Sequence, residues 1–406
     1  MRGVSGPMAR RCGDRHRIRT VRPSCRRSVR RYAQLGEGKA VMVRSVGVEE
    51  ELLLVDEASG EPRALATAVL AAATREASER KEEVFEAELH REQLEFATRP
   101  QTDMGELARE IADCRADAAR HAGRHGATVV ALGTSPLPVS PSVGSGERYR
   151  WLEEHFGLTT YEQLTCGCHV HVSVESDEEG VAVLDRVRPW LPVLLAMSAN
   201  SPFWQGRDSR YHSYRSRVWD RWPSAGPTDL FGTADRYHAY VEAMIGTGVL
   251  RDEGMIYFDA RLSRSYPTVE FRIADVCLDA STTVLVATLA RALVETAARQ
   301  WKADEPPVPH RTELLRLASW RAARSGLDGQ LLHPLTMRPA PADEVVRALY
   351  DHVREALEDS GDALPAREAL FALLANGTGA RAQRELLNRT QSLGDMVIAC
   401  ARRTAR

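Results

Sequence analysis

The sequence predicts an α+β fold built around a largely antiparallel sheet. Strand-like runs occur between residues 43 and 273, whereas every periodic segment after Asp279 is helical. Helices also do not follow every strand, as they would in a doubly wound parallel sheet. The chain has 406 residues, of which 43% are hydrophobic and 27% charged, so it is long enough to bury a core and has the composition of a globular protein.

Strands dominate the first part of the chain. Runs of β-branched and apolar residues that end in Gly, Pro, Asp or Ser predict strands, and apolar residues spaced by three or four predict helices. In order, we predict a strand at Val43–Val55, a helix at Thr67–Ala77, one or two strands in Val84–Thr98, a helix over 103–126 with Asp103 as N-cap, and strands at Thr128–Leu132 and Cys166–Val174. A loop rich in Pro, Ser and Gly separates the last two strands, over 135–146.

The second part of the chain is mostly helical. Residues 200–232, rich in Trp, Tyr, Arg, Gly and Pro, have no clean period and predict an ordered functional loop. Two strands are predicted, at Met255–Leu262 and Pro267–Ile273. The predicted helices are Val181–Ala199, Asp235–Met244, Thr282–Lys302, Thr312–Arg324, Ala342–Glu358, Ala366–Leu374, Ala380–Leu387 and Leu393–Arg403.

The charge is distributed unevenly. Residues 1–40 hold 11 Arg and one Lys against two acids, a balance of 12 − 2 = +10, so the other 366 residues carry 42 − 54 = −12. We expect 1–41 to be a basic disordered head or an over-extended translation start ahead of Met42, and 42–406 to be a single domain. A nucleic-acid arm is the remaining alternative, but the acidic body makes nucleic acid a poor partner.

The composition excludes several classes of protein. No run of about 18 apolar residues is present, so no membrane-spanning helix is expected. Seven scattered Cys predict no disulfide framework and a reducing, cytoplasmic location. The chain has no GxxxxGK[ST], GxGxxG, GxSxG or HExxH motif, which excludes the commonest nucleotide loops, the hydrolase elbow and the zinc-protease helix.

Three adjacent glutamates, Glu49, Glu50 and Glu51, lie in the first predicted strand. Successive side chains of a strand point to opposite faces, so Glu49 and Glu51 share one face while Glu50 lies with Val48 and Leu52 on the other. Two carboxylates held together on a partly buried face need a cation, and hard oxygen ligands suit Mg²⁺ or Mn²⁺. A solvated strand edge is the alternative interpretation.

Two further strands repeat this pattern. Leu94 and Phe96 predict a core face, which leaves Glu95 on the polar face as a candidate ligand, with Glu92 a weaker one. Near residue 270, the polar face carries Glu270 and Arg272 together. These two could form a simple ion pair, or a metal ligand beside a phosphate-binding guanidinium.

The segment Cys166-Gly167-Cys168-His169-Val170-His171 is similar to a zinc site in composition only. Strand alternation places the thiols on one face and the imidazoles on the other, so the four groups cannot close a tetrahedron around one Zn²⁺. We expect the thiols in the core and His169 and His171 on a polar face, where they are structural or contact a nucleotide or a metal.

Arginines are concentrated in the loop that starts at Asn200. Arg binds carboxylates and phosphates through two parallel hydrogen bonds, so this cluster predicts a small anionic substrate. Its members are Arg207, Arg210, Arg215 and Arg217. Because the chain holds 51 Arg, no single one of them is decisive.

Several of these motifs occur in the order found in one family. The chain resembles the carboxylate-amine ligases called glutamate-cysteine ligase type 2. The shared motifs are Val46–Glu51, Gln93–Thr98, Cys166–Val172, Asn200–Gly206 with its Tyr-Arg-Ser-Arg continuation, Trp222-Pro223 and the run from Tyr257 through Arg272. The resemblance covers nearly everything from Met42 to about Arg403 and leaves out the basic head. Leu262 departs from the family pattern, which usually has Pro after the Arg of Asp-x-Arg.

This resemblance implies a glutamine-synthetase-like fold, with a polar concave sheet face, helices on the other side and a helical C-terminal part. It implies that ATP, L-glutamate and L-cysteine form γ-glutamylcysteine through an acyl phosphate. Glu49, Glu51, Glu95 and Glu270 would hold Mg²⁺ or Mn²⁺.

For the basic residues, the resemblance implies two sets of roles. Arg272, Arg207 and Arg215 would be catalytic, and His169, His171, Arg210, Arg217 and Arg261 would bind substrate or nucleotide. The expected partners are small-molecule substrates, and the resemblance does not decide whether the protein is a monomer or a homo-oligomer. The alternatives are a ligase for another amine or carboxylate, and a nucleotide-independent metallohydrolase.

Overall fold

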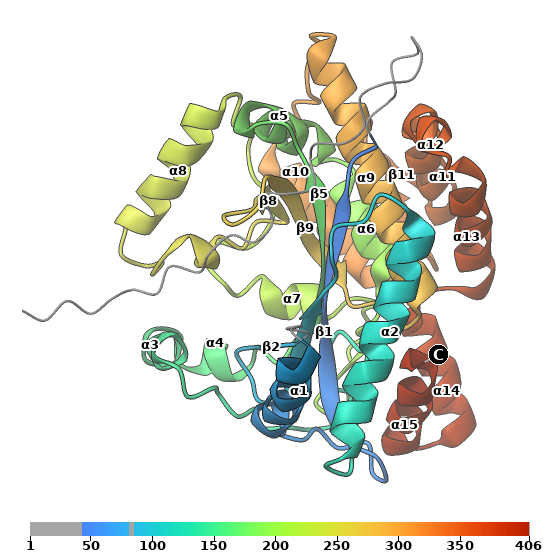
Figure 1. Ribbon diagram of the computed structural model, residues 1–406. Coiled ribbons are helices and arrows are strands. Elements are labelled where there is room, and N and C mark those ends of the chain that lie inside the picture. Colours follow the sequence, from blue (N-terminus) through green and yellow to red (C-terminus); the bar gives the residue numbers. More distant parts are fainter. Residues whose placement is uncertain (1–42, 81–84, 406) are drawn as a thin grey trace, which may run out of the picture. The chain divides into compact units, whose positions relative to one another are not determined.

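A computed structural model describes residues 43–80 and 85–405 (Figure 1). Residues 1–41, for which the basic head is predicted, lie outside this range. The chain divides into two units, residues 1–41 and residues 42–406, and only the second unit is described below. In this described part, no helix is long and apolar enough to cross a membrane.

The main sheet has seven strands in the order β2-β3-β1-β5-β9-β8, with β4 pairing with part of β1. All of its pairings are antiparallel, which confirms the predicted class. The strands are β1 (Val46–Asp56), β2 (Glu86–Ala87), β3 (Gln93–Ala97), β4 (Ala127–Val130), β5 (Gly167–Ser173), β8 (Ala260–Leu262) and β9 (Thr268–Asp275). The central strand β1 pairs with both β3 and β5, so residues that are far apart in sequence meet across it.

Helices make up most of the rest of the described chain. The longest ones are amphipathic or fully apolar, and they begin at good caps where the sequence provides them, as Asp103 does for α2. They are α1 (Ala66–Arg80), α2 (Met104–Gly123), α3 (Glu147–Phe156), α4 (Leu158–Tyr161), α5 (Asp177–Val187), α6 (Leu191–Ser198), α7 (Arg215–Trp219), α8 (Ala234–Gly246), α9 (Ala280–Lys302), α10 (Thr312–Ser325), α11 (Ala342–His352), α12 (Arg354–Ser360), α13 (Ala363–Asn376), α14 (Gly379–Thr390) and α15 (Leu393–Thr404).

The hydrophobic core lies between one face of the sheet and a layer of helices. Leu52, Leu94, Val170 and Val269 all point into it and are fully buried. The Ala- and Leu-rich helix α9 packs on β5 and β1, and α2 runs beside it on the same side of the sheet (Figure 1). Because side chains alternate along a strand, burying this face leaves the opposite face for polar residues.

Several predicted boundaries were wrong. The single helix predicted at Val181–Ala199 is two helices, α5 and α6, because Pro189 lacks a backbone N–H and cannot continue a helix. The helix predicted at Ala342–Glu358 is also divided, at Val353. Helices α3 and α4, and a hairpin of β10 (Gln330–Leu332) and β11 (Pro339–Pro341), were not predicted. The loop over 200–232 contains α7 and a second hairpin, β6 (Phe203–Trp204) with β7 (Arg207–Asp208).

Candidate active site

A cavity of about 390 Å³ opens on the polar face of the sheet. We call it the carboxylate cavity, because four glutamates predicted as ligands line it together with four predicted basic residues. Those eight are Glu49, Glu51, Glu95, Glu270, His169, His171, Arg261 and Arg272. The structure therefore brings together side chains from β1, β3, β5, β8 and β9.

Strand register explains why these residues meet. Adjacent strands place Glu51 opposite Glu95, Glu49 opposite His169, His171 opposite Glu270, and Glu270 opposite Arg261. Side chains directly opposite each other on one face have Cβ atoms about 5 Å apart. The eight residues thus form a continuous polar band across five strands.

The residue between the two carboxylates of β1 points to the other face. Glu50 is fully buried there and pairs with Arg115 of α2, with Nε to Oε2 and Nη2 to Oε1 distances both of 2.7 Å. Arg115 also donates to the backbone oxygens of Cys277 and Leu278. This buried pair connects β1, α2 and the segment after β9, and it holds Glu49 and Glu51 toward the cavity.

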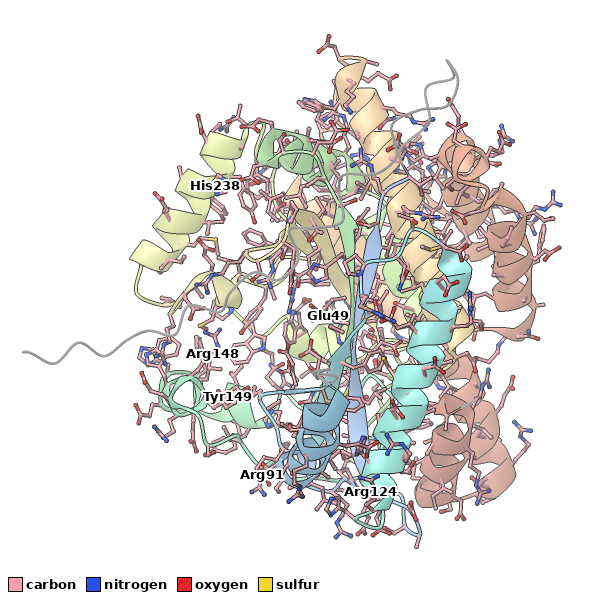
Figure 2. All side chains as sticks on the ribbon, viewed as in Figure 1. Glu49, Arg91, Arg124, Arg148, Tyr149 and His238 are labelled. Atoms are coloured by element: carbon pink, nitrogen blue, oxygen red, sulfur yellow. The ribbon has the colours of Figure 1, made fainter. Side chains whose placement is uncertain are left out.

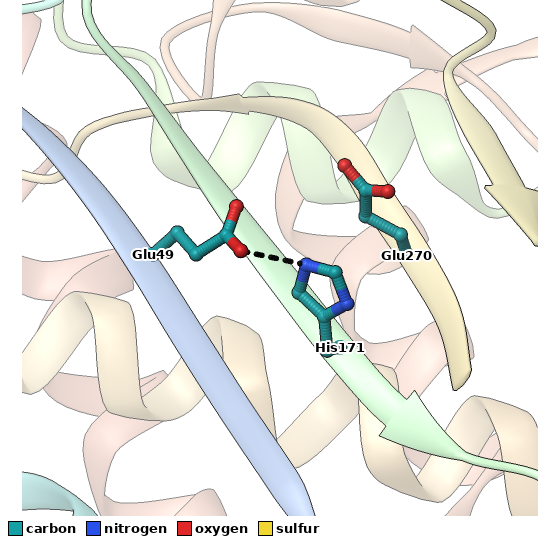
Figure 3. A group of neighbouring side chains, drawn as sticks. All are labelled: Glu49, His171 and Glu270. Atoms are coloured by element: carbon teal, nitrogen blue, oxygen red, sulfur yellow. Dashed lines mark ion pairs between the residues drawn. The ribbon is translucent and has the colours of Figure 1, made fainter. Parts of the chain in front are cut away.

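Glu49 lies at the centre of the polar band. Its Oε2 is 3.1 Å from Nδ1 of His169, and its Oε1 is 3.2 Å from Nε2 of His171 (Figure 3). Burial alone would raise the pKa of Glu49, but the hydrogen bonds of the two imidazoles, the largest opposing cause, lower it. Burial, and then the charge of Arg272, lower the pKa of His169 to about 4. Glu49 is therefore held as a carboxylate beside a neutral His169 near pH 7.

Glu270 is paired with two arginines. Arg261 Nε lies 2.8 Å from Glu270 Oε2, and Arg272 donates to Glu270 Oε1. Burial acts to raise the pKa of Glu270, but the two guanidinium charges outweigh it and lower the pKa. The Arg272 guanidinium lies over the rings of Trp219 and Tyr257, 5.9 Å from each centroid. These contacts fix a permanent positive charge on the cavity wall.

Glu51 and Glu95 lie opposite each other on β1 and β3. Burial, and then the charge of Glu88, raise the pKa of Glu51 to about 7. The same two effects, in the same order, raise the pKa of Glu95 well above its usual value. Neighbouring buried carboxylates are costly to ionise, and for Glu51 the charges of Arg215 and Arg272 offset this cost only in part. A divalent cation at this position would supply the missing charge.

The donor set fits a divalent metal ion. One group consists of Glu49, Glu95 and His169 and another of Glu49, His171 and Glu270, and in each the donor atoms lie within 4.8 Å of one another. Nε2 of His169 is buried and has no hydrogen-bond partner in the described chain. Carboxylate oxygens with one imidazole nitrogen suit Mg²⁺ or Mn²⁺, with Mn²⁺ the more tolerant of nitrogen.

The loop arginines do not line the carboxylate cavity. Arg207 and Arg210 are exposed, on and after β7. Arg217 pairs with Asp220 at 2.8 Å. Arg215 is buried behind β9, where its Nη2 and Nη1 lie 3.4 Å from the carbonyl oxygens of Arg272 and Ile273. These contacts suit Arg215 to positioning β9, and the roles predicted for all four loop arginines stay predictions.

The cavity also has residues that the sequence did not single out. Arg148 and Tyr149 of α3 lie across from Glu49 (Figure 2), and Glu88 and Trp219 line the wall. Helix α3 was not predicted, so nothing in the sequence pointed to Arg148. Trp219 lies two residues after the end of the Tyr-Arg-Ser-Arg motif, and this short distance is the one sequence signal that could have predicted its place in the cavity.

Comparison with known proteins identifies the class as ligases of the glutamate-cysteine type. The family model described as "Glutamate-cysteine ligase family 2(GCS2)" matches residues 45–402, so the chain belongs to this family. A Streptomyces coelicolor protein named "Putative glutamate--cysteine ligase 2" is 65% identical over 362 residues, 89% of this chain and 99% of that protein. A similarly named Streptomyces avermitilis protein is 64% identical with the same coverage.

Solved structures show the same fold at low sequence identity. The glutamate-cysteine ligase of Francisella tularensis, in complex with AMP, aligns with a TM-score of 0.64 and 14% identity over 89% of this chain and 88% of that one. A bifunctional glutathione synthetase from Pasteurella multocida aligns with a TM-score of 0.65 and 15% identity over 89% of this chain and 52% of that one. At such identities the likeness shows the fold.

Proposed function

We propose that this chain is an ATP-dependent ligase that joins the γ-carboxylate of L-glutamate to the amino group of L-cysteine. Membership of the ligase family supports the reaction class. The observation that carries the proposal is the polar band, in which four glutamates, two histidines and two arginines from five strands face one cavity. A related fold that binds AMP in the Francisella tularensis ligase supports a nucleotide as one substrate.

The reaction takes place in two displacements. An oxygen of the glutamate γ-carboxylate attacks the γ-phosphorus of ATP, the bond from that phosphorus to the β–γ bridging oxygen breaks, and ADP leaves. The amine nitrogen then attacks the carbonyl carbon of the acyl phosphate, phosphate leaves with the bonding pair, and the nitrogen loses a proton. No covalent bond to the protein is needed in either step.

The protein contributes charge placement and orientation. We infer that Arg272 and Arg261 stabilise the negative charge that develops on the transferring phosphoryl group, since both guanidinium groups are fixed beside Glu270. Arg148 also lines the cavity, and although it pairs with Asp252, its other N–H groups could bind a substrate carboxylate. The aromatic walls formed by Trp219 and Tyr257 restrict water around the reacting groups.

The acidic residues would hold the metal. Glu49, Glu51, Glu95 and Glu270 would provide oxygen ligands, with His169 as a nitrogen ligand. A bound Mg²⁺ supplies neutralisation of the phosphate charge and a template for the nucleotide. The protein itself keeps Glu49 ionised through its two histidines, and thus keeps a charged ligand ready in the cavity.

An ADP-release assay with Mg²⁺, ATP, L-glutamate and a panel of amines tests this proposal. We expect ADP to form only when a carboxylate substrate and an amine are both present, and cysteine to have the highest kcat/KM. If another amine has the highest kcat/KM, the protein is still a ligase, but its second substrate is that amine and not cysteine. Amide cleavage without ATP, and no ADP with any amine, would show a metallohydrolase and refute the proposal.

A further inference from the structure

A second polar cavity, of about 270 Å³, lies on the other side of the β8–β9 edge. We call it the rear cavity. Its walls come from α7, α10 and the loop 222–227, and Ile273 of β9 and Asp259 form its floor. In Figure 1, α7 lies beside the sheet and α10 lies behind β9. None of the four predicted metal ligands lines this cavity.

Alternating residues separate the two cavities. On β9, Arg272 lines the carboxylate cavity, whereas the next residue, Ile273, lines the rear cavity. At the end of α7, Trp219 lines the carboxylate cavity and Asp220 lines the rear cavity. The rear cavity is therefore a distinct site that shares a wall with the proposed active site.

The rear cavity holds opposite charges that lack direct partners. The Asp259 carboxylate has no hydrogen bond or ion pair within the described chain, although it senses the charges of Arg217 and Arg316. The Arg316 guanidinium, on α10, is exposed and forms no ion pair with any described residue. By contrast, the nearby Arg217 and Arg221 pair with Asp220 and Glu162.

Two neutral donors in the same walls are also unpaired. Trp222 Nε1 and Ser319 Oγ are buried without a hydrogen-bond partner, and their residues are 2% and 7% exposed. Buried polar groups in folded proteins are nearly always hydrogen-bonded, so each such group needs an explanation. Two buried unpaired donors, in walls that also carry the half-buried Asp259 and the exposed Arg316, point to a polar ligand.

Asp259 is half-buried in a site with another carboxylate nearby. Burial, and then the neighbouring charge of Asp220, raise the pKa of Asp259 to about 7, and the nearby arginines only partly offset this. A ligand with a cationic group near Asp259 would hold this carboxylate ionised, and an anionic group of the same ligand could pair with the exposed guanidinium of Arg316.

We propose that the rear cavity binds a free α-amino acid, with its ammonium group at Asp259 and its carboxylate at Arg316. The size agrees, because the rear cavity, of about 270 Å³, is smaller than the carboxylate cavity, of about 390 Å³, and has room for a small ligand such as a single amino acid. Trp222 Nε1 and Ser319 Oγ are then available for the ligand's side chain or carboxylate.

Calorimetric titration of the full-length protein with each of the twenty common L-amino acids tests this proposal. The titrations use the wild type and the variants Glu49→Gln, Arg316→Gln and Asp259→Asn. We expect one or more amino acids to bind Glu49→Gln as they bind the wild type, which separates this site from the proposed active site. Arg316→Gln should weaken that binding about tenfold or more, because a charge-assisted hydrogen bond is lost.

The matched control is Arg311→Gln, an exposed arginine just before α10 that pairs with Glu313 and lines neither cavity. It should bind like the wild type. For the tightest amino acid, its N-acetyl and its amide derivatives should both lose affinity, since each lacks one of the two charges. If no amino acid binds Glu49→Gln, or if Arg316→Gln binds as tightly as the wild type, the proposal is wrong. Because Arg316 is exposed, this variant should fold even if Asp259→Asn does not.

Discussion

At the scale of single residues, strand alternation accounts for most of the candidate site. The faces of Glu49, Glu95 and Glu270 follow directly from the apolar residues beside them, so sequence alone could predict them. The partners could not be predicted in this way, because the opposition of Glu51 and Glu95 depends on the register between β1 and β3. The charge state of these acids likewise depends on neighbours such as Glu88, which lies seven residues before Glu95 in sequence.

Glu49→Gln should lower the rate of ADP formation about a hundredfold or more, the scale expected when one preorganised charged group is lost. Glutamine keeps the size of the side chain and can still bond to His169, so the circular dichroism spectrum and Tm should remain those of the wild type. The control is Glu61→Gln, an exposed residue beyond the end of β1, which should retain full activity. If Glu49→Gln forms ADP at the wild-type rate, Glu49 has no role in catalysis.

At the scale of elements, the buried pair Glu50–Arg115 links the strand that carries Glu49 and Glu51 to helix α2. Both side chains are at most 1% exposed, and Thr283 Oγ1 donates to Glu50 Oε1 at 2.6 Å. Sequence patterns predicted Glu50 on the core face but gave no partner for it, since Arg115 is 65 residues away. Charge pairing inside a core depends on tertiary packing, which periodicity does not encode.

Arg115→Met should destabilise the fold by about 3–5 kcal/mol, because it leaves the Glu50 carboxylate buried without a partner. Urea denaturation measures this loss. The double variant Arg115→Met/Glu50→Leu removes both charges and should recover a large part of the stability. If the double variant is as unstable as the sum of its single variants, the two residues do not act as a pair.

The elements themselves were predicted unevenly, for identifiable reasons. Long periodic segments such as α2 and α9 were predicted correctly. The prediction over 181–199 ran one helix through Pro189, although a proline inside a helical pattern indicates a break. Helix α3, which carries Arg148, has short and mixed periodicity, so its contribution to the cavity could be seen only in the fold. The arginine-rich loop was predicted to meet a substrate, whereas the structure directs Arg215 to the backbone of β9.

At the scale of the whole molecule, the family match and the described sheet begin at nearly the same residue. The match covers residues 45–402, and the described antiparallel sheet begins with β1 at Val46. The strongly basic residues 1–40 lie before that match. The fold class was predictable because strands precede helices along the chain, and the family was predictable because its motifs occur in order.

A chain that starts at Met42 should have the kcat, KM and Tm of the full-length protein, since the described site and core lie entirely after that residue. Side-by-side ADP-release assays and thermal unfolding of the two chains check this. A loss of activity in the shorter chain would assign a function to the basic segment.

The central claim is that glutamates from β1, β3 and β9 hold a divalent cation on one face of the sheet. Calorimetric titration with Mn²⁺ of the wild type, Glu49→Gln, Glu95→Gln and the control Glu61→Gln tests it most directly. We predict that Mn²⁺ binds the wild type and the control equally, and binds Glu49→Gln and Glu95→Gln at least about tenfold more weakly. Equal Mn²⁺ affinity in all four proteins would contradict the claim.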